Sequence, residues 1–296
     1  MSLNGARSVH NEITDIAAIV DLDKYPLHFG VPPGRQEMLE RCHTLLEKDG
    51  CCVLPNFIRP EAIEQIAAEG EMVAPEAYYQ SETVNVYNIK IEQRLPVGHP
   101  AEVQFQRENA FVARDKIPPS HLIQKLYTNT FFQKFLADCF RLPKIHPLAD
   151  PLAGLCLSVL KPGKSHPWHF DINEFTVSLL TRQAEEGGVF EYCPGIRGPD
   201  AENFSLVREV LDGKADDCIQ QLGLHCGDLQ LFCGRYSLHR VSSVEGERER
   251  HSAIFAYTQE AGVVGGLART QQLFGRTLDV HTIAERATVR SDKLLD

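Results

Sequence analysis

The 296-residue sequence contains no apolar run of membrane-spanning length and no basic start followed by a long apolar stretch. It also contains no CxxC pair, so neither a zinc ribbon nor a thioredoxin-type motif is expected. Its nine cysteines are scattered through apolar runs, which favours reduced core thiols over a disulfide framework. We therefore expect a cytoplasmic protein with structural thiols and no membrane partner.

Positive charge is scarce as well. Thirty Lys and Arg residues stand against 40 Asp and Glu residues, which gives a formal net charge of −10. This acidic balance argues against nucleic acid as a partner. The hydrophobic fraction of 43% and the charged fraction of 24% are those of an ordinary globular chain that can bury a sizeable core.

The pattern of the sequence changes near residue 149. Before it, helical spacing predicts helices over residues 35–48 and 59–73 and one or two helices over 122–139, and alternation predicts a strand over 82–93. After it come short runs rich in β-branched and aromatic residues, each bounded by Gly, Pro or Asp, with one helical insert at 202–214. Many short strands of this kind favour a sandwich or barrel.

We predict a mostly β protein with N-terminal helices, organised as one domain over residues 1–296. Residues 1–148 would supply helical support and N-terminal strands, residues 149–277 the β core, and residues 278–296 a C-terminal tail.

The single tryptophan lies between two histidines, just ahead of an aspartate, in the segment SHPWHFDINEF at residues 165–175. On a strand, residues i and i+2 point to the same face, so His169 and Asp171 would share a face and Phe170 would point away. The pair is either a polar loop end or part of a metal site. Two ligands are too few to hold an open catalytic metal, so a partner is needed.

His239, in GRYSLHRVSSV, offers the third ligand, because two histidines and a carboxylate on a β scaffold form the facial triad of non-haem Fe(II) sites. Arg250 follows eleven residues later and would start the next strand after a hairpin. A guanidinium buried there needs an anion, and its planar fork suits a carboxylate. A dicarboxylate that chelates iron at one end would present its other carboxylate to Arg250.

These segments resemble a known family. They are similar to the Fe(II)/2-oxoglutarate-dependent oxygenase superfamily, and most similar to the branch of BesD/HalD-type free-amino-acid halogenases and their hydroxylase relatives. The resemblance covers roughly residues 149–277, and the N-terminal half more loosely. It implies a double-stranded β-helix (jelly roll, cupin-like) core, with His169, Asp171 and His239 as catalytic iron ligands and Arg250 bound to the distal carboxylate of 2-oxoglutarate. The segments are WHFDINEF, GGVFEYCPGIR, CGDLQLFCGRYSLHRVSSVEGERERHSAIFAY and LFGRT.

The resemblance implies an enzyme that uses Fe(II), 2-oxoglutarate and O2 to oxidise an unactivated C–H bond, with release of succinate and CO2. In the halogenases of this branch a small residue replaces the iron-binding carboxylate and leaves a position for halide. Asp171 occupies that position here, so hydroxylation is favoured, with desaturation or cyclisation as alternatives. The branch suggests a free amino acid or similar small polar metabolite as substrate, in biosynthesis. A regulatory protein that senses 2-oxoglutarate or oxygen is the alternative of another class, and a homodimer is left open.

Three further residues are candidates for substrate contacts. Arg107 aligns loosely with the relatives at a position that could bind a substrate carboxylate. His166 either meets substrate, supports the iron ligands, or is a surface histidine before Pro167. Asn173 shares the parity of Asp171 and would line the pocket if the strand continues that far.

Overall fold

The computed structural model describes residues 12–27, 33–284 and 294–295. Two antiparallel sheets form the centre of this part of the chain. The prediction of a mostly β fold with N-terminal helices and a double-stranded β-helix core is confirmed. In spatial order, the larger sheet contains β1 (Cys51–Leu54), β12 (Leu229–Phe232), β8 (Thr176–Arg182), β15 (Arg250–Phe255), β6 (Leu155–Leu160) and β4 (Ala110–Val112). The smaller sheet contains β11 (Gln220–Leu222), β10 (Phe190–Cys193), β13 (Leu238–Val241) and β7 (His166–His169).

The two faces of the larger sheet differ in character. On β6 and β15, Leu157 and Ala253 lie opposite each other in register and join the main hydrophobic core. The alternate residues, such as Leu160 and its register partner Arg250, point to the other face. Leu160 packs there against Val241 of the smaller sheet. The space between the sheets is therefore where inward-pointing side chains meet.

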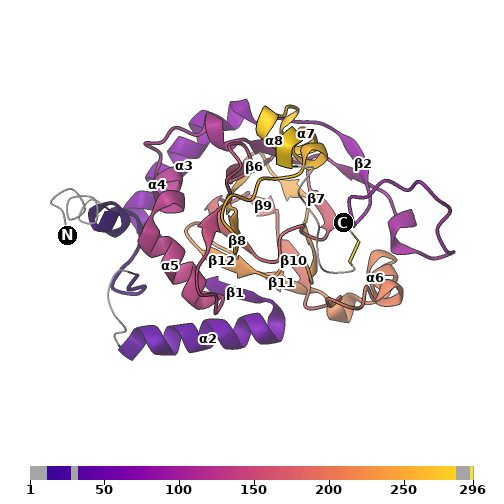
Figure 1. The fold of residues 1–296 in the computed structure, drawn as a ribbon, viewed down its shortest axis with the longest axis horizontal. Helices are drawn as coiled ribbons and strands as arrows, with labels where there is room; N and C mark the ends of the chain where they lie inside the picture. The colour runs from indigo at the N-terminus through magenta and orange to yellow at the C-terminus, as the bar shows by residue number, and fades with distance from the viewer. Residues whose placement is uncertain (1–11, 28–32, 285–293, 296) are drawn as a thin grey trace.

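The helices in the N-terminal half lie together on one side of the sheets, and α6 lies on the opposite side (Figure 1). The predicted helical segment at 122–139 is two helices, because Asn129 caps the second: its Oδ1 accepts hydrogen bonds from the N–H groups of Phe131 and Phe132. The helices are α2 (Pro33–Asp49), α3 (Pro60–Val73), α4 (Leu122–Thr128), α5 (Thr130–Cys139), α6 (Phe204–Leu211), α7 (Leu267–Phe274) and α8 (Asp279–Ala284), with a further helical segment at 12–19.

The structure differs from the prediction over residues 82–93, where only β2 (Glu82–Val84) is a strand. It pairs with β3 (Phe105–Arg107). The alternation ends at Asn85, whose Oδ1 accepts a hydrogen bond from the N–H of Tyr87 and forms an Asx turn. The larger sheet also takes β1 and β4 from before residue 149, so the expected boundary at that residue does not delimit the sheet.

The remaining elements are short. The short strands are β5 (His146–Pro147), β9 (Glu186–Gly187), β14 (Val244–Glu245) and β16 (Tyr257–Thr258), and the 3-10 helices are η1 (Ala74–Glu76), η2 (Pro100–Glu102), η3 (Arg114–Lys116) and η4 (Asp216–Cys218).

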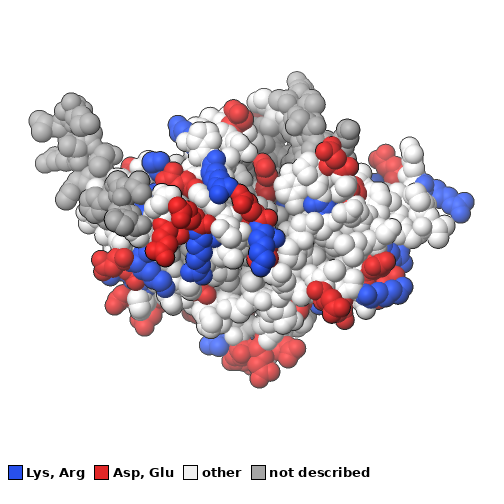
Figure 2. All heavy atoms as spheres, turned by 90° about the horizontal axis from the view of Figure 1, so that it is seen from below, with Lys and Arg blue, Asp and Glu red and all other residues white. Residues whose placement is uncertain are grey.

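No described helix combines the length and the apolar character needed to cross a membrane. On the face shown in Figure 2, acidic and basic side chains lie interspersed.

Candidate metal centre and co-substrate pocket

Three predicted ligands converge between the sheets. His169 ends β7 and lies directly opposite His239 of β13 in the strand register. The Nε2 atoms of His169 and His239 are 3.8 and 3.5 Å from Asp171 Oδ1. One ligand atom from each residue lies within 4.8 Å of the others, and no second group of this kind occurs among residues 12–27, 33–284 and 294–295.

Both histidines are held in the tautomer that a metal requires. Nδ1 of His169 lies 2.8 Å from the carbonyl oxygen of Pro167, and Nδ1 of His239 lies 2.9 Å from that of Ser237. A carbonyl only accepts, so each Nδ1 carries the proton and each Nε2 has a free lone pair. Burial, together with His239, lowers the pKa of His169 to about 3, which keeps this imidazole neutral near pH 7.

The position of Asp171 is fixed by contacts with Thr176 and Gly234. β7 ends at His169, so Asp171 reaches the histidines from the loop rather than from the strand itself. Its N–H donates to the carbonyl oxygen of Gly234 at 3.1 Å, and its Oδ2 accepts from Thr176 Oγ1 at 2.7 Å. A Cβ at Gly234 would lie 2.0 Å from Oδ2, so only glycine leaves space for this carboxylate.

The charge of Asp171 also suits a cation. Burial acts to raise its pKa, but the neighbouring imidazoles of His239 and His169 and the hydrogen bond from Thr176 hold the pKa well below its usual value. The donor set is thus two imidazoles and one anionic carboxylate, which is the set that binds non-haem Fe(II) and leaves coordination positions open. The residues present fit an iron ion.

Arg250 starts β15 and points into the same space. Its side chain is buried, and Nη1 donates to Ser252 Oγ at 2.9 Å. Burial lowers its pKa to about 10, so it remains a cation at neutral pH. Within the described part of the chain no carboxylate pairs with it. Gly188 provides the room, since a Cβ there would lie 2.9 Å from Arg250 Cδ.

The three candidate substrate contacts have different positions. His166 is stacked on His169 with ring centroids 3.9 Å apart, and burial lowers its pKa well below the usual value. Arg107 on β3 is 3% exposed, and its Nε and Nη1 are buried without a hydrogen-bond partner. Asn173 is exposed in the loop beyond β7. The structure therefore brings His166 to the triad and leaves Asn173 outside the strand on which its prediction depended.

Two polar residues at this site have no clear sequence signal. Arg269 lies on α7, where an arginine in an amphipathic helix would normally face solvent. Asn109 is 2% exposed, and neither its amide nitrogen nor its amide oxygen has a partner. Because Ala110 pairs with Val159, Asn109 continues the row of Leu160 and Arg250 across the larger sheet. Only the strand register shows this.

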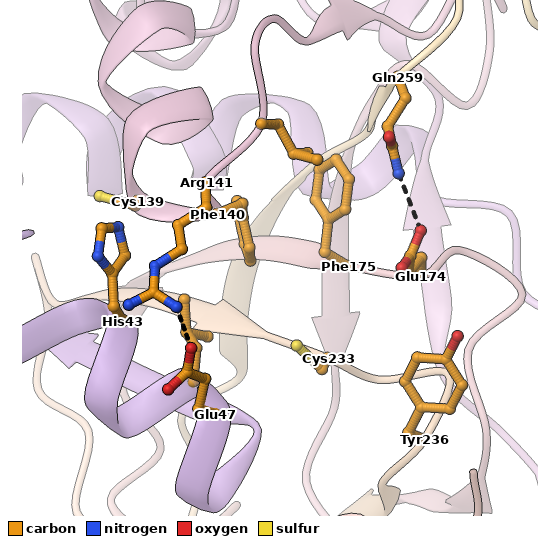
Figure 3. A pocket seen from close by; sticks show the side chains of 12 residues that line it. His43, Glu47, Cys139, Phe140, Arg141, Glu174, Phe175, Cys233, Tyr236 and Gln259 are labelled. Atoms are coloured by element: carbon orange, nitrogen blue, oxygen red, sulfur yellow. Dashed lines mark hydrogen bonds and ion pairs between the residues drawn. The ribbon is translucent and has the colours of Figure 1, made fainter. Parts of the chain in front are cut away.

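A separate hollow of about 250 Å³ lies away from these residues (Figure 3). It is bounded by α2, the end of α5 and the segment that joins β7 to β8, and no triad residue lines it. Its polar groups already have partners, since Arg141 pairs with Glu47 and Glu174 accepts a hydrogen bond from Gln259. We place no chemistry in this hollow.

The sheets and the triad together define a non-haem iron oxygenase of the 2-oxoglutarate-dependent class. The family model described as Halogenase D matches residues 35–271, which is most of the chain. The chain therefore belongs to the halogenase D family, and the superfamily and branch predicted from the sequence are confirmed. A search of curated proteins finds no match.

Solved structures share the fold at low sequence identity. The epimerase SnoN from nogalamycin biosynthesis, in complex with Fe3+, alpha ketoglutarate and nogalamycin RO, is 15% identical with a TM-score of 0.55, covering 82% of this chain and 93% of SnoN. The carbocyclase SnoK from nogalamycin biosynthesis is 14% identical with a TM-score of 0.53, covering 77% and 87%. AviO1 from Streptomyces viridochromogenes Tue57 is 14% identical with a TM-score of 0.51, covering 79% and 98%. Family and donor set agree with the predicted cofactors, Fe(II) and 2-oxoglutarate.

Proposed function

We propose that this protein is an Fe(II)- and 2-oxoglutarate-dependent hydroxylase of a free amino acid or similarly small polar metabolite. The observation that carries the proposal is the convergence of Asp171 with the two histidines His169 and His239. When bound, iron supplies the activation of O2 that couples decarboxylation of 2-oxoglutarate, to succinate and CO2, with oxidation of an unactivated C–H bond.

Residues of this chain would bind and orient the iron ion and the co-substrate. His169 Nε2, His239 Nε2 and an oxygen of Asp171 hold the ion, and the carbonyl groups behind the imidazoles fix the ring orientation. Arg250 binds the distal carboxylate of 2-oxoglutarate, with Ser252 keeping the guanidinium in place. Apolar side chains around Leu160 and Val241 exclude water from this region and so strengthen the charge–charge contact.

Substrate binding is assigned to Arg107 and His166. Nε and Nη1 of Arg107 have no partner and lie on different edges of the guanidinium, so a substrate carboxylate would accept a charge-assisted hydrogen bond from one of them. His166 lies over the ring of His169 as a neutral imidazole and borders the same region. Asn173 is not part of this proposal, because its side chain is exposed.

Asp171 favours hydroxylation within a family named for halogenation. Its carboxylate occupies the ligand position that a halide would need, and the Thr176 hydroxyl holds it there, while the Gly234 carbonyl holds the backbone N–H of Asp171. The hydrogen bond from Thr176 would have to be lost before the carboxylate could leave the position. The residues present therefore support oxygen transfer.

The experiment that tests the function supplies the Fe(II)-loaded protein with 2-oxoglutarate, O2 and single L-amino acids. We expect one substrate to give stoichiometric succinate and a product heavier by one oxygen atom, detected by mass spectrometry. A product lighter than the substrate by two hydrogen atoms would indicate desaturation or cyclisation in place of hydroxylation. Tight binding of 2-oxoglutarate without succinate from any substrate would favour the sensor instead.

Arg250→Ala is expected to raise the 2-oxoglutarate concentration required for half-maximal succinate formation by roughly thirty-fold or more. Loss of one partner of a buried charge pair costs about 2–5 kcal/mol, because the remaining charge is left without compensation. Iron binding should persist, since Arg250 is not a ligand. The measurement is a 2-oxoglutarate titration at fixed iron.

Arg240→Ala is the matched control. Arg240 lies next to His239 on β13, but its side chain pairs with Glu191 and packs over the Trp168 ring, and it is 39% exposed. Its removal should leave the 2-oxoglutarate requirement within about two-fold of the wild type. If Arg250→Ala behaved like this control, the distal carboxylate would bind elsewhere.

A further inference from the structure

A second group of arginines lies near the triad, beneath α7. Arg107 Nη2 donates to the backbone oxygen of Gln272 at 3.1 Å. Arg269 donates through Nη1 to the side-chain oxygen of the same glutamine. One residue of α7 therefore holds both guanidinium groups, which places their remaining N–H groups close together.

The positive charge of this group is not balanced by the protein. Glu82 is the acid at this position: its Oε2 lies 3.6 Å from Arg107 Nη2 and accepts from Gln272 Nε2 at 2.8 Å. Among the described residues Arg269 makes no ion pair. Within the described part of the chain, Glu82 is thus the one carboxylate near both guanidinium groups, because Asp171, which also acts on Arg269, is an iron ligand. Arg107 is buried and Arg269 is partly buried, and charge removed from water without a partner is costly, so a further anion would stabilise the arrangement.

Packing connects this group to the iron ligands. Phe274, at the end of α7, packs in one cluster with Phe111 of β4. The Phe111 ring meets His166 edge-on at 6.3 Å between centroids, and His166 is stacked on His169. α7 lies at one end of the sheets, on the side of β6 and β7 (Figure 1). The charge of Arg269 is also felt by Asp171 and His166.

We propose that Arg107 and Arg269 together bind a substrate with two acidic groups, so that the substrate is a dicarboxylic amino acid of the aspartate or glutamate class. This inference rests on the proposed function, whose substrate contact at Arg107 it extends. Arg107 takes one carboxylate through an unpartnered N–H group, on Nε or Nη1, and Arg269 takes the other.

Other amino acids meet the two guanidinium groups less well. A neutral amide side chain leaves Arg269 without a counter-charge. The ammonium group of lysine is repelled by both guanidinium groups, which one glutamate cannot offset. Because one glutamine contacts both arginines, the two acidic groups must also lie near each other, as they do on a short side chain.

The test is calorimetric titration of the protein loaded with Mn(II) and 2-oxoglutarate, without O2, by L-aspartate, L-glutamate, L-asparagine, L-glutamine and L-lysine. Each acid is compared with its isosteric amide, so shape is constant and charge alone changes. We expect at least one acid to bind roughly thirty-fold more tightly than its amide, as loss of a buried charge-assisted contact implies. Lysine should bind more weakly than either acid.

Arg269→Gln should reduce this preference to about three-fold or less without changing affinity for 2-oxoglutarate, and Arg269→Lys should retain part of it. Arg276→Gln is the control: Arg276 lies just beyond α7 and pairs with Asp115 at 2.6 Å, so the preference should be unchanged. Equal binding of acid and amide by the wild type, tighter binding of lysine, or a full preference in Arg269→Gln would each overturn the proposal. If one of those results were obtained, succinate formation with some other amino acid would still support the proposed hydroxylase function. A protein that binds neither Fe(II) nor 2-oxoglutarate would contradict both the hydroxylase function and the acidic substrate.

Discussion

His239→Ala is expected to abolish stoichiometric iron binding and reduce succinate formation to background while the chain stays folded. Its Nε2 is one of three protein ligand atoms, and the two that remain cannot hold an ion with open positions. Loss of an outer hydrogen-bond partner alone costs about 10–100-fold in metal affinity, so loss of a ligand should cost more. His169→Ala should behave in the same way.

The fold should survive because β13 is held by other contacts. It pairs with β10 and β7, and its neighbouring residues Leu238 and Val241 are buried in apolar clusters. The measurement is iron content after anaerobic loading and desalting, with thermal unfolding measured alongside. His225→Ala is the control, because the His225 side chain is 74% exposed and lies near Asp228, away from the triad. Stoichiometric iron in both triad variants would refute the ligand assignment.

The parts of the site that follow strand rules could be predicted from the sequence. His169 and His239 lie on strands that pair directly, and Arg250 begins β15. The predicted hairpin was wrong, because β15 pairs with β6 and β8 in the larger sheet and not with β13. Local patterning predicts such positions because strand residues alternate between faces. The same rule was wrong over residues 82–93, because an Asx turn at Asn85 changed the chain direction. The rule does not apply to Asn173 either, since β7 ends four residues earlier, at His169.

Features that depend on contacts between distant segments could not be predicted from one sequence. The position of the Asp171 carboxylate requires the missing side chain of Gly234, which is 63 residues away in the chain. Arg269 becomes part of the site only because α7 packs on β4. A glycine or a helical arginine looks the same in a sequence whether it serves such a contact or faces solvent.

The two groups of arginines near the iron ligands are proposed to bind different molecules, the co-substrate and the substrate. Arg250 and Ser252 lie on β15, and no described carboxylate pairs with Arg250, which suits the distal end of the co-substrate. Arg107 and Arg269 lie on β3 and α7, next to His166. Under the two proposed assignments, 2-oxoglutarate and an acidic substrate would be bound by different arginines and could therefore be present at the same time. This separation is what a dicarboxylate substrate would require of an enzyme whose co-substrate is also a dicarboxylate.

No halogenated product is expected from the native protein on any substrate, even at high chloride concentration. The carboxylate of Asp171 fills the position that halide would take, and the hydrogen bond from Thr176 keeps it in place. Asp171→Gly removes one of three ligands, so it should weaken iron binding and abolish most hydroxylation. It should not by itself create a halogenase, because a bound halide also needs hydrogen-bond donors around it.

The test is mass spectrometry of native reactions run in chloride and then in bromide, with the hydroxylated product as the internal reference. Thr176→Val is the matched control: it keeps the carboxylate and loses only its hydrogen bond at 2.7 Å. This variant should still give the hydroxylated product, at a lower rate because Asp171 is less firmly positioned. A product with the isotope pattern of chlorine or bromine from the native chain would show that Asp171 leaves the iron during turnover. The position of this one carboxylate would then not decide the reaction.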